Sequence, residues 1–495
     1  MLQLKICKLY VSAPFQGASN TRSSRLWKDI AVAIAFCIGL SNFCAAQTFR
    51  ALASFDGTNG ESPLDAPLVQ GANGHFYGTT SSGGADNGGT VFEVAAGHGL
   101  VTLYNFCSQD VCTDGFSPQA GLVLSTNGNF YGTTFGDEFN FFGTVFEITP
   151  GGRLATLHTF CSQGDCSDGA DPYSGLVQST NGNFYGATIY GGNGFGTVFE
   201  ITAGGKLITV HSFVRSDGSE PGGLVEGANG KFYGITRTGG THNYGTVFIM
   251  TPDGELATLY NFANDSYGAY PNSGLIQAAD GNFYGTTSGG VNGQGTVFEI
   301  TADGRLATLY SFCAQTNCPD GAGPNGGLVQ ATDGNFYGTT SAGGLNGRGT
   351  IFEITPGRKL TTLYSFCARR NCPDGSDPFA ALLQGTDGDF YGTTAGGGRD
   401  TCSQGCGTVF SLSTGLGAFV KALPASGNVG AAVKVLGTGL SGATSVSFND
   451  ITATFTVVSD SEITTTVPSG ASTGTVAVQT PTGILNSNLA FRVLP

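Results

Sequence analysis

Acidic side chains recur at the same position of successive segments in this chain of 495 residues. They are its most regularly spaced candidates for catalytic or metal-binding residues. A carboxylate can bind Ca²⁺ or serve as a general acid or base, whereas an Asp-Gly pair also favours a tight turn. The spacing matches no calcium-binding loop, so we expect turns and no cofactor, with calcium as the alternative. The pairs begin at Asp56, Asp114, Asp168, Asp217, Asp320 and Asp374, and Asp171 and Asp377 follow three residues after two of them.

The five histidines form no metal-binding or catalytic motif. Zinc-protease, serine-hydrolase and phosphate-loop sequences are also missing, so we predict no catalytic residue and no metal site. His158 and His211 stand where equivalent segments carry a tyrosine, and we interpret them as structural substitutions.

Ten of the thirteen cysteines form close pairs, and the other three lie at or before residue 44. Four pairs occupy loops that are longer than their equivalents. The chain contains repeated segments ending in Leu-x-x-Phe and repeated Phe-Tyr-Gly motifs. The Phe of such a segment and the Tyr of the next Phe-Tyr-Gly are 25 residues apart where a cysteine pair lies between them, and 20 or 22 residues apart where none does. We therefore predict local disulfides, with zinc binding as the alternative. The predicted pairs are Cys107 with Cys112, Cys161 with Cys166, Cys313 with Cys318, Cys367 with Cys372 and Cys402 with Cys406.

One loop differs from its equivalents by being rich in aromatic and acidic residues. Equivalent loops are glycine-rich, and function in a repeat protein often lies where the repeats differ. These side chains are candidates for contacting a sugar or a protein, and packing under a neighbouring loop is the alternative. The candidate binding residues are Phe135, Asp137, Glu138, Phe139, Phe141 and Phe142.

These residues are positioned by a sevenfold repeat. Phe-Tyr-Gly occurs seven times, and so do Gly-Thr-Val/Ile-Phe and a Leu-x-x-Phe-like segment. An Asn-Gly or Asp-Gly pair precedes each Phe-Tyr-Gly, which favours a tight hairpin. Each unit of about 50 residues therefore predicts four antiparallel strands, the size of a β-propeller blade. The motif tyrosines are Tyr77, Tyr131, Tyr185, Tyr233, Tyr284, Tyr337 and Tyr391.

The repeat is permuted at its two ends. Leu52–Phe55 is a fourth-strand segment that has no first three strands before it, and the last Gly-Thr-Val-Phe, ending at Phe410, has no fourth strand after it. A ring explains both ends if the N-terminal strand completes the last unit. We therefore predict an all-β fold in which a seven-bladed β-propeller is closed by an N-terminal strand, with an open solenoid as the alternative.

Residues 1–46 predict an export signal. Basic residues precede an apolar run from Ile30 to Leu40, and small residues follow up to Ala46. The run is too short to span a membrane comfortably, so we expect no membrane span after its removal. The remaining chain carries 16 basic and 34 acidic side chains, a net charge of −18, which disfavours nucleic-acid binding. We expect a secreted or cell-surface bacterial protein located beyond the inner membrane.

The repeat motifs end near residue 414, so the repeats are assigned to residues 47–414. Short strands separated by turn residues continue over residues 415–495 without cysteine, among them Ala453–Val458 and Leu489–Val493, and they predict a small immunoglobulin-like β-sandwich.

Two families resemble these regions. The repeat resembles the bacterial GloVer tandem repeat through Asp-Gly-Asn-Phe-Tyr-Gly-Thr-Thr and Gly-Thr-Val-Phe-Glu-Ile-Thr, over about residues 50–412. The tail is similar to IPT/TIG domains at Leu436–Leu440 and Val458–Ile463. The resemblance implies an exported protein and supplies no catalytic residues.

We therefore expect an exported, non-enzymatic binding or cell-surface interaction protein whose ligand is an extracellular glycan or a protein. The first alternative is a polysaccharide-active enzyme, a hydrolase or lyase built on the propeller scaffold, because propellers can bring carboxylates from several blades together. The second alternative is a structural component of the envelope.

Overall fold

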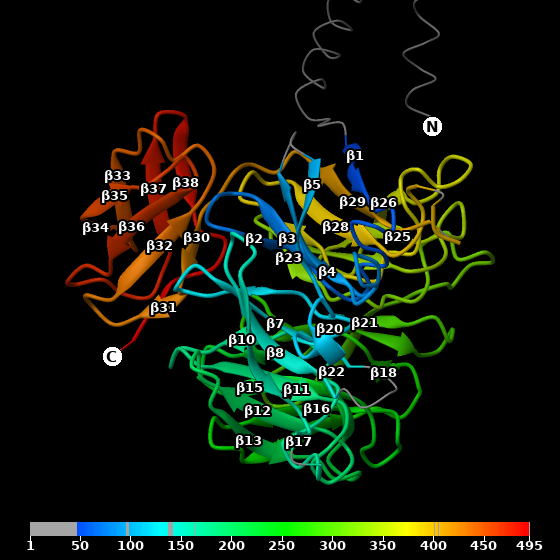
Figure 1. The fold of residues 1–495 in the computed structure, drawn as a ribbon. Helices are drawn as coiled ribbons and strands as arrows, with labels where there is room; N and C mark the ends of the chain where they lie inside the picture. Colours follow the sequence, from blue (N-terminus) through cyan, green and yellow to red (C-terminus); the bar gives the residue numbers. More distant parts are fainter. Residues whose placement is uncertain are drawn as a thin grey trace, which may run out of the picture. The chain divides into compact units, whose positions relative to one another are not determined.

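The computed structural model describes residues 47–95, 99–136, 142–162, 164–399, 401–403 and 405–494. Its regular structure consists of β-strands and one short 3₁₀ turn at Asp110–Cys112, and these ranges contain no α-helix (Figure 1). Within the same ranges, no helix is long and apolar enough to cross a membrane. The protein is therefore an all-β chain.

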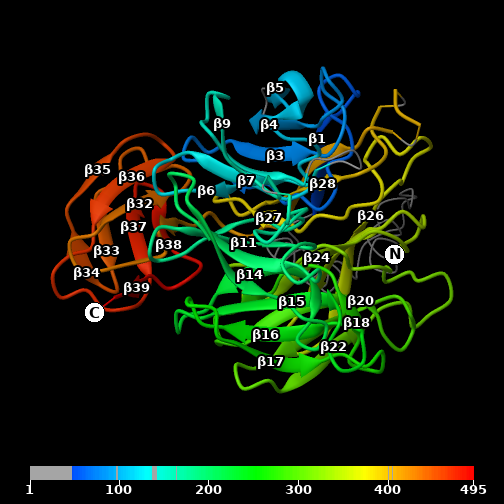
Figure 2. The same cartoon turned by 60° about the horizontal axis from the view of Figure 1, so that its bottom comes forward.

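Each of the seven sequence repeats forms one antiparallel sheet. Sheet 1 contains β2 (Val69–Gln70), β3 (Phe76–Thr80), β4 (Thr90–Ala95) and β5 (Gly99–Asn105). Sheet 2 contains β6 (Val123–Leu124), β7 (Phe130–Thr134), β8 (Thr144–Ile148) and β9 (Leu154–Thr159). Sheet 3 contains β10 (Val177–Gln178), β11 (Phe184–Thr188), β12 (Thr197–Ile201) and β13 (Leu207–Ser212). Sheet 4 contains β14 (Ser219–Glu226), β15 (Phe232–Thr238), β16 (Thr246–Met250) and β17 (Leu256–Asn261), which lie side by side in Figure 2.

The last three repeats follow the same plan with one addition. Sheet 5 contains β18 (Ala269–Pro271), β19 (Ile276–Gln277), β20 (Phe283–Gly289), β21 (Thr296–Ile300) and β22 (Leu306–Ser311), with β18 and β19 both paired to β20. Sheet 6 contains β23 (Val329–Gln330), β24 (Phe336–Thr340), β25 (Thr350–Ile354) and β26 (Leu360–Ser365). Sheet 7 contains β27 (Leu383–Gln384), β28 (Phe390–Thr394), β29 (Thr408–Ser413) and β1 (Thr48–Ser54).

The N-terminal strand completes the last sheet, as the permuted motifs predict. β1 pairs antiparallel with β29, from Thr48 opposite Ser413 to Ser54 opposite Thr408, and the two strands lie together in Figure 1. Sheet 7 is therefore assembled from both ends of the repeat region.

The motif residues are buried between strands and sheets. All five residues of β3 are buried, and Phe92 of β4 is fully covered. Gly78 lies opposite Phe92, and a Cβ on Gly78 would approach Phe92 Cζ to 2.6 Å. The last position of Phe-Tyr-Gly therefore packs against the Phe of Gly-Thr-Val-Phe, which explains why this position is glycine.

A repeated contact joins each sheet to the next. In one example, Asp171 N donates to Phe142 O at 2.8 Å, and Pro172 packs on Gly143, where a Cβ would lie 2.5 Å from Pro172 Cδ. Asp171 adopts a left-handed backbone, with φ of 57°. The residue before proline has positive φ in all seven units, at Ser62, Ser117, Asp171, Glu220, Tyr270, Gly323 and Asp377.

Glutamine side chains add a second link between sheets. Gln178 of sheet 3 accepts from Thr126 N of sheet 2 at 3.2 Å, and Gln70 of sheet 1 accepts from Thr386 N of sheet 7 at 3.0 Å. Gln277, Gln330 and Gln384 make the same bond. Two units depart from glutamine: sheet 2 carries Leu124, and sheet 4 carries Glu226, which still accepts from Thr180 N.

The C-terminal region forms two four-stranded sheets and a short parallel pair. One sheet has the order β30 (Lys421–Leu423), β32 (Ala432–Leu436), β36 (Glu462–Thr466), β35 (Phe455–Val457). The other has the order β34 (Ile451–Ala453), β33 (Ser445–Phe448), β37 (Val476–Thr480), β38 (Gly483–Asn486). β31 (Ser426–Gly427) pairs with β39 (Arg492–Val493). Val435, Phe448, Ile463 and Val478 belong to their shared core.

Two strand predictions in this region need correction. The strand predicted over Ala453–Val458 is divided between β34 and β35, which pair with different sheets, because the chain crosses from one sheet to the other at Thr454. The strand predicted from Leu489 to Val493 is confined to Arg492–Val493, and β38 was not predicted.

Candidate functional site

The direction of the strands separates two faces of the repeat region. In six repeats, the Asn-Gly or Asp-Gly hairpin and the turn between the third and fourth strands lie at one end of the sheet, and in sheet 7 the hairpin lies at the end where β29 finishes and β1 begins; we call this end the hairpin face. The other end, the loop face, carries the connection between the second and third strands and the connection to the next sheet. All of the paired cysteines lie in these loop-face connections.

A cavity of about 660 Å³ is lined by residues from all seven sheets. Its wall is formed by the segments that lead into the first strand of each sheet, and these segments begin on the loop face. Seven of the lining residues are glycine, among them Gly326 and Gly327, which precede β23. Three of the polar lining residues, Tyr173, Asn272 and Asn325, occupy the position that follows the proline shared by all repeats.

Asp65 and Tyr173 form the most unusual pair in the cavity. The Tyr173 hydroxyl donates a hydrogen bond to Asp65 Oδ2, and thereby links sheets 1 and 3 past sheet 2. Burial raises the pKa of Asp65, although the bond from Tyr173 opposes this shift. Burial and the adjacent carboxylate raise the pKa of Tyr173 as well. A carboxyl group that is desolvated in a cavity and held by a specific partner is typical of functional sites.

Glu220 and Arg237 supply the second charged pair, both from sheet 4. Their side chains approach to 3.7 Å, and Glu220 Oε1 also accepts from Thr238 Oγ1 at 3.4 Å. Arg237 is more than half exposed, and its charge lowers the pKa values of Asp65 and Tyr173 against the larger effect of burial. The positive charge of the Arg237 guanidinium group therefore offsets part of the negative charge of the acidic side chains in the cavity.

Two carboxamides line the part of the cavity formed by sheets 5 and 6. Asn272 Nδ2 donates to Asn325 Oδ1 at 2.8 Å, and Asn325 Nδ2 donates to Ser341 Oγ at 2.8 Å. Sheet 7 contributes apolar groups instead, Phe379 and Ala381. The cavity thus combines paired charges, carboxamides and aromatic rings, an arrangement typical of small-molecule sites.

The predicted aromatic loop reaches this cavity at its first residue. Phe135 makes an edge-to-face contact with Tyr173, with ring centroids 6.0 Å apart. Phe142 is 36% exposed, and its carbonyl accepts the bond from Asp171 N. The other four candidates, Asp137, Glu138, Phe139 and Phe141, lie outside the described residues.

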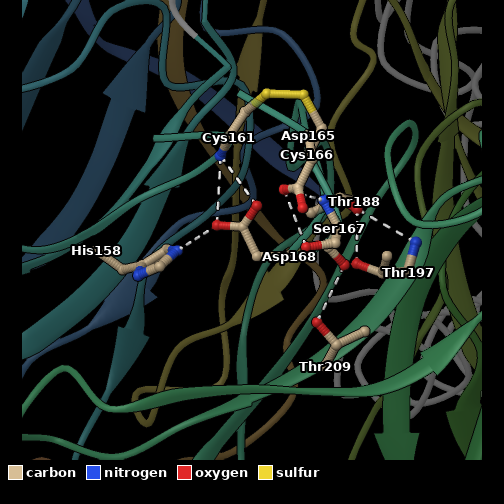
Figure 3. A network of polar contacts seen from close by, with 9 residues as sticks. All are labelled: His158, Cys161, Asp165, Cys166, Ser167, Asp168, Thr188, Thr197 and Thr209. Atoms are coloured by element: carbon tan, nitrogen blue, oxygen red, sulfur yellow. Dashed lines mark hydrogen bonds and ion pairs between the residues drawn. A yellow bond between two sulfur atoms is a disulfide. The ribbon is translucent and has the colours of Figure 1, made fainter. Parts of the chain in front are cut away.

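The Asp-Gly carboxylates hold loop-face turns together rather than converging on one site. Asp168 accepts from Cys161 N at 3.1 Å and contacts His158 Nε2 at 2.9 Å, beside the Cys161–Cys166 disulfide (Figure 3). Tyr104 makes the equivalent bond to Asp114 at 2.8 Å, so His158 replaces a tyrosine in the same contact. Across the described ranges, no group of three or more His, Cys, Asp or Glu residues is placed to hold a metal.

All five predicted cysteine pairs are disulfide-bonded. Four of them clip the loop between a fourth strand and the next sheet, and the fifth clips the loop between β28 and β29. Each bond therefore restrains a loop-face connection. In chain order, the bonds join Cys107 to Cys112, Cys161 to Cys166, Cys313 to Cys318, Cys367 to Cys372 and Cys402 to Cys406.

Sequence reasoning missed the central residues of the cavity, Asp65, Tyr173 and Glu220. One signal was available, because the position after the shared proline varies whereas the proline itself and the following leucine repeat in all seven units. The proline-to-leucine spacing is also one residue longer in sheet 1 and one shorter in sheet 4, where Asp65 and Glu220 lie. The variable position is occupied by Leu64, Gln119, Tyr173, Gly222, Asn272, Asn325 and Phe379.

Solved structures with a similar fold come from several kinds of protein. The extracellular domain of a hybrid two-component system from B. thetaiotaomicron is 12% identical, with 91% of this chain and 55% of that chain covered and a TM-score of 0.50. This chain therefore spans about half of that domain, and the likeness concerns the propeller-like fold alone. A glucose dehydrogenase-type oxidoreductase from Thermus thermophilus (13% identity, 74% and 100% covered, TM-score 0.38) and puromycin hydrolase (13%, 69% and 52%, 0.46) are also similar.

Sequence comparison is more specific than these structural likenesses. No curated protein sequence matches the chain. The Gloeobacter/Verrucomicrobia repeat matches residues 41–225, 193–398 and 289–436, and the IPT/TIG domain matches residues 419–493. Because the repeat matches extend over most of its length, this protein belongs to the Gloeobacter/Verrucomicrobia repeat family and ends in an IPT/TIG domain.

Proposed function

We propose that this protein is an exported binding protein that holds its ligand in the central cavity of a seven-bladed β-propeller, with the IPT/TIG domain folded as an immunoglobulin-like sandwich. The observation that carries the proposal is the Asp65–Tyr173 pair in a cavity to which every sheet contributes. Burying a carboxyl group costs free energy because the group loses its hydration. An apolar residue would pack at this place without that cost, so the buried carboxyl group of Asp65 indicates a role other than packing.

The rest of the cavity supports a binding role. Sheets 1, 3, 4, 5 and 6 place aspartate, tyrosine, glutamate with arginine, and two asparagines at the wall, whereas the motif residues between the sheets hardly vary. A repeated scaffold with variable residues at one concave site is the arrangement expected of a binding protein.

Export is supported by the predicted signal over residues 1–46 and by the five disulfides. Disulfides persist in oxidising compartments, so we place the protein beyond the inner membrane, secreted or at the cell surface.

The test is a binding screen of the mature protein against extracellular polysaccharides and cell-wall proteins. Asn325→Ala and Tyr173→Phe remove cavity groups and should reduce retention of the ligand. Gln119→Ala is the matched control, because Gln119 follows the shared proline in sheet 2 but directs its amide to Ser117 Oγ, outside the cavity wall. A ligand retained equally by all three variants would place binding elsewhere.

A polysaccharide-active enzyme is the second candidate, favoured by the raised pKa of Asp65. A raised pKa makes a carboxyl group better able to donate a proton as a general acid. The distinguishing measurement is release of reducing ends from polysaccharides, lost in Asp65→Asn. Binding without any release of reducing ends would exclude the enzyme.

A further inference from the structure

The hairpin face of the repeat region is occupied by the protein's own C-terminal domain. Ser461 Oγ donates to Ala72 O of sheet 1 at 2.6 Å, and Asn488 Nδ2 donates to Gln330 O of sheet 6 at 3.0 Å. Lys421 Nζ donates to Gln384 O of sheet 7 at 2.7 Å. Sheets 6, 7 and 1 are consecutive in the ring, and Arg492 of the same domain donates to the carbonyl of Ala228 in sheet 4, so the domain reaches across the hairpin face.

The two departures from the ring of glutamines coincide with this domain. Leu124, which replaces glutamine in sheet 2, belongs to the same apolar cluster as Leu436 of the C-terminal domain. Glu226, which replaces glutamine in sheet 4, lies 3.8 Å from Arg492, and Arg492 also donates to the carbonyl of Ala228. Among the described residues, the hairpin face is therefore covered by the C-terminal domain, and we infer that the cavity is entered from the loop face.

A cavity with one opening restricts the shape of its ligand. A polymer cannot thread through it, and an inner stretch of a long chain cannot reach its wall. A volume of about 660 Å³ falls within the usual range for small ligands and holds roughly two or three sugar rings. The site thus suits a small molecule or the end of a chain.

The groups on the wall match a neutral, hydroxyl-rich ligand. Asn272 and Asn325 each keep a donor and an acceptor beyond their mutual bond, since a carboxamide has two N–H groups and two lone pairs. The rings of Tyr173 and Phe379 offer apolar faces to the C–H side of a sugar.

The charged groups of the cavity are already engaged with one another. Arg237 pairs with Glu220, and Asp65 accepts from Tyr173. An anionic ligand would have to compete with Glu220 for the guanidinium group, and a cationic ligand would have to compete with Arg237 and Tyr173 for the carboxylates. A ligand without net charge avoids both costs.

We propose that the cavity binds the end of a neutral glycan chain, which enters from the loop face while the C-terminal domain closes the opposite end. This inference rests on the proposed function, because it names the ligand class of the same site. It predicts that one protein binds per chain, whatever the length of the chain, because the two ends of a glycan differ and only one of them fits the cavity.

Isothermal titration of the mature protein with linear oligosaccharides of the amylose, cellulose, xylan, mannan and chitin series tests this proposal. In the series that binds, affinity should increase up to about three units and then stay constant within about twofold, because the cavity is full. The stoichiometry should remain one protein per chain, and cyclodextrin, which has no chain end, should not bind. Asn325→Ala should raise the Kd about tenfold, and Gln119→Ala should leave it within about twofold.

Several outcomes would overturn the proposal. Stoichiometry that rises with chain length would show that inner stretches bind, and cyclodextrin binding as tightly as linear maltohexaose would show the same for glucans. If tetralysine or oligogalacturonate binds best and Asn325→Ala abolishes that binding, the ligand class is wrong but the proposed function stands. If no probe, including the cell-wall proteins of the binding screen, depends on a cavity residue, the proposed function fails as well.

Discussion

Gly407 of the last repeat packs against Pro63 of the first, and a Cβ on Gly407 would lie 2.9 Å from Pro63 Cδ. The same contact joins every other neighbouring pair of sheets, for example Gly143 with Pro172. Beside it, Ser62 N donates to Cys406 O at 3.1 Å. The junction between the two ends of the repeat region is therefore built like the junctions within it.

Replacing Gly407 should weaken this junction. Gly407 has φ of 94°, and a Cβ would also lie 2.3 Å from Thr394 O, so Gly407→Ala should lower the free energy of unfolding by about 2–4 kcal/mol. Gly281→Ala is the control, since Gly281 has φ of 87° with nothing within 4 Å and should cost about 1 kcal/mol. Equal losses in urea denaturation would contradict a packed junction.

The pH dependence of stability should change when Asp171 is replaced. Burial raises the pKa of Asp171 from 3.8 to about 6, so the folded state holds this proton more tightly than the unfolded state. The resulting stability is complete below pH 3.8 and is lost as the pH rises through about 6. Asn cannot ionise and tolerates the positive φ of this position.

Asp171→Asn should therefore stabilise the protein at pH 7 by about 1 kcal/mol, a value reduced for solvent screening of a half-buried group. At about pH 3.5 the gain should vanish. Thermal unfolding of both proteins between about pH 3.5 and 8 measures this difference, and a gain that does not depend on pH would assign it to the backbone instead.

The C-terminal domain should detach when its apolar contact is made polar. Leu124→Gln restores the residue of the other repeats but buries a carboxamide against Leu436, at a cost of about 1–3 kcal/mol. Scanning calorimetry should then show a separate, earlier transition for residues 416–494. Leu124→Met conserves volume and should keep the wild-type profile. An unchanged profile for Leu124→Gln would mean that Leu124 is not needed for docking.

The disulfides should each contribute modest stability. Replacing Cys367 and Cys372 together by Ser opens a short loop and should lower the free energy of unfolding by about 2 kcal/mol. The equivalent replacement of Cys313 and Cys318 opens a loop of the same length and should cost a similar amount. Non-reducing mass spectrometry of the mature wild-type protein should find no free thiol. Labelling of any of the ten cysteines would contradict the pairing.

Local features of the fold were readable from the sequence. The Phe-Tyr-Gly and Gly-Thr-Val-Phe segments form the second and third strands, because their residues pack in register across each sheet. The displaced Leu52–Phe55 segment predicted the pairing of β1 with β29, since sheet 7 otherwise lacks a fourth strand.

The cavity was not readable in the same way. Asp65 and Tyr173 are 108 positions apart and belong to sheets that are not neighbours. Each repeat contributes only a few residues to the wall, and only the closed arrangement brings them together. The sequence did not show why sheet 2 has Leu124 where other sheets have glutamine. The reason is similar, because Leu436, in the same apolar cluster, belongs to a different domain.

The pairing of β1 with β29 also affects the order in which the repeat region can fold. Thr48 is among the first residues of the described chain to leave the ribosome or an export channel, yet its partner Ser413 follows about 360 residues later. β1 therefore stays unpaired until almost the whole repeat region has been synthesised. Contacts this distant in sequence form slowly. Because the last sheet needs the first strand, the repeat region can close only after nearly all of it has been synthesised.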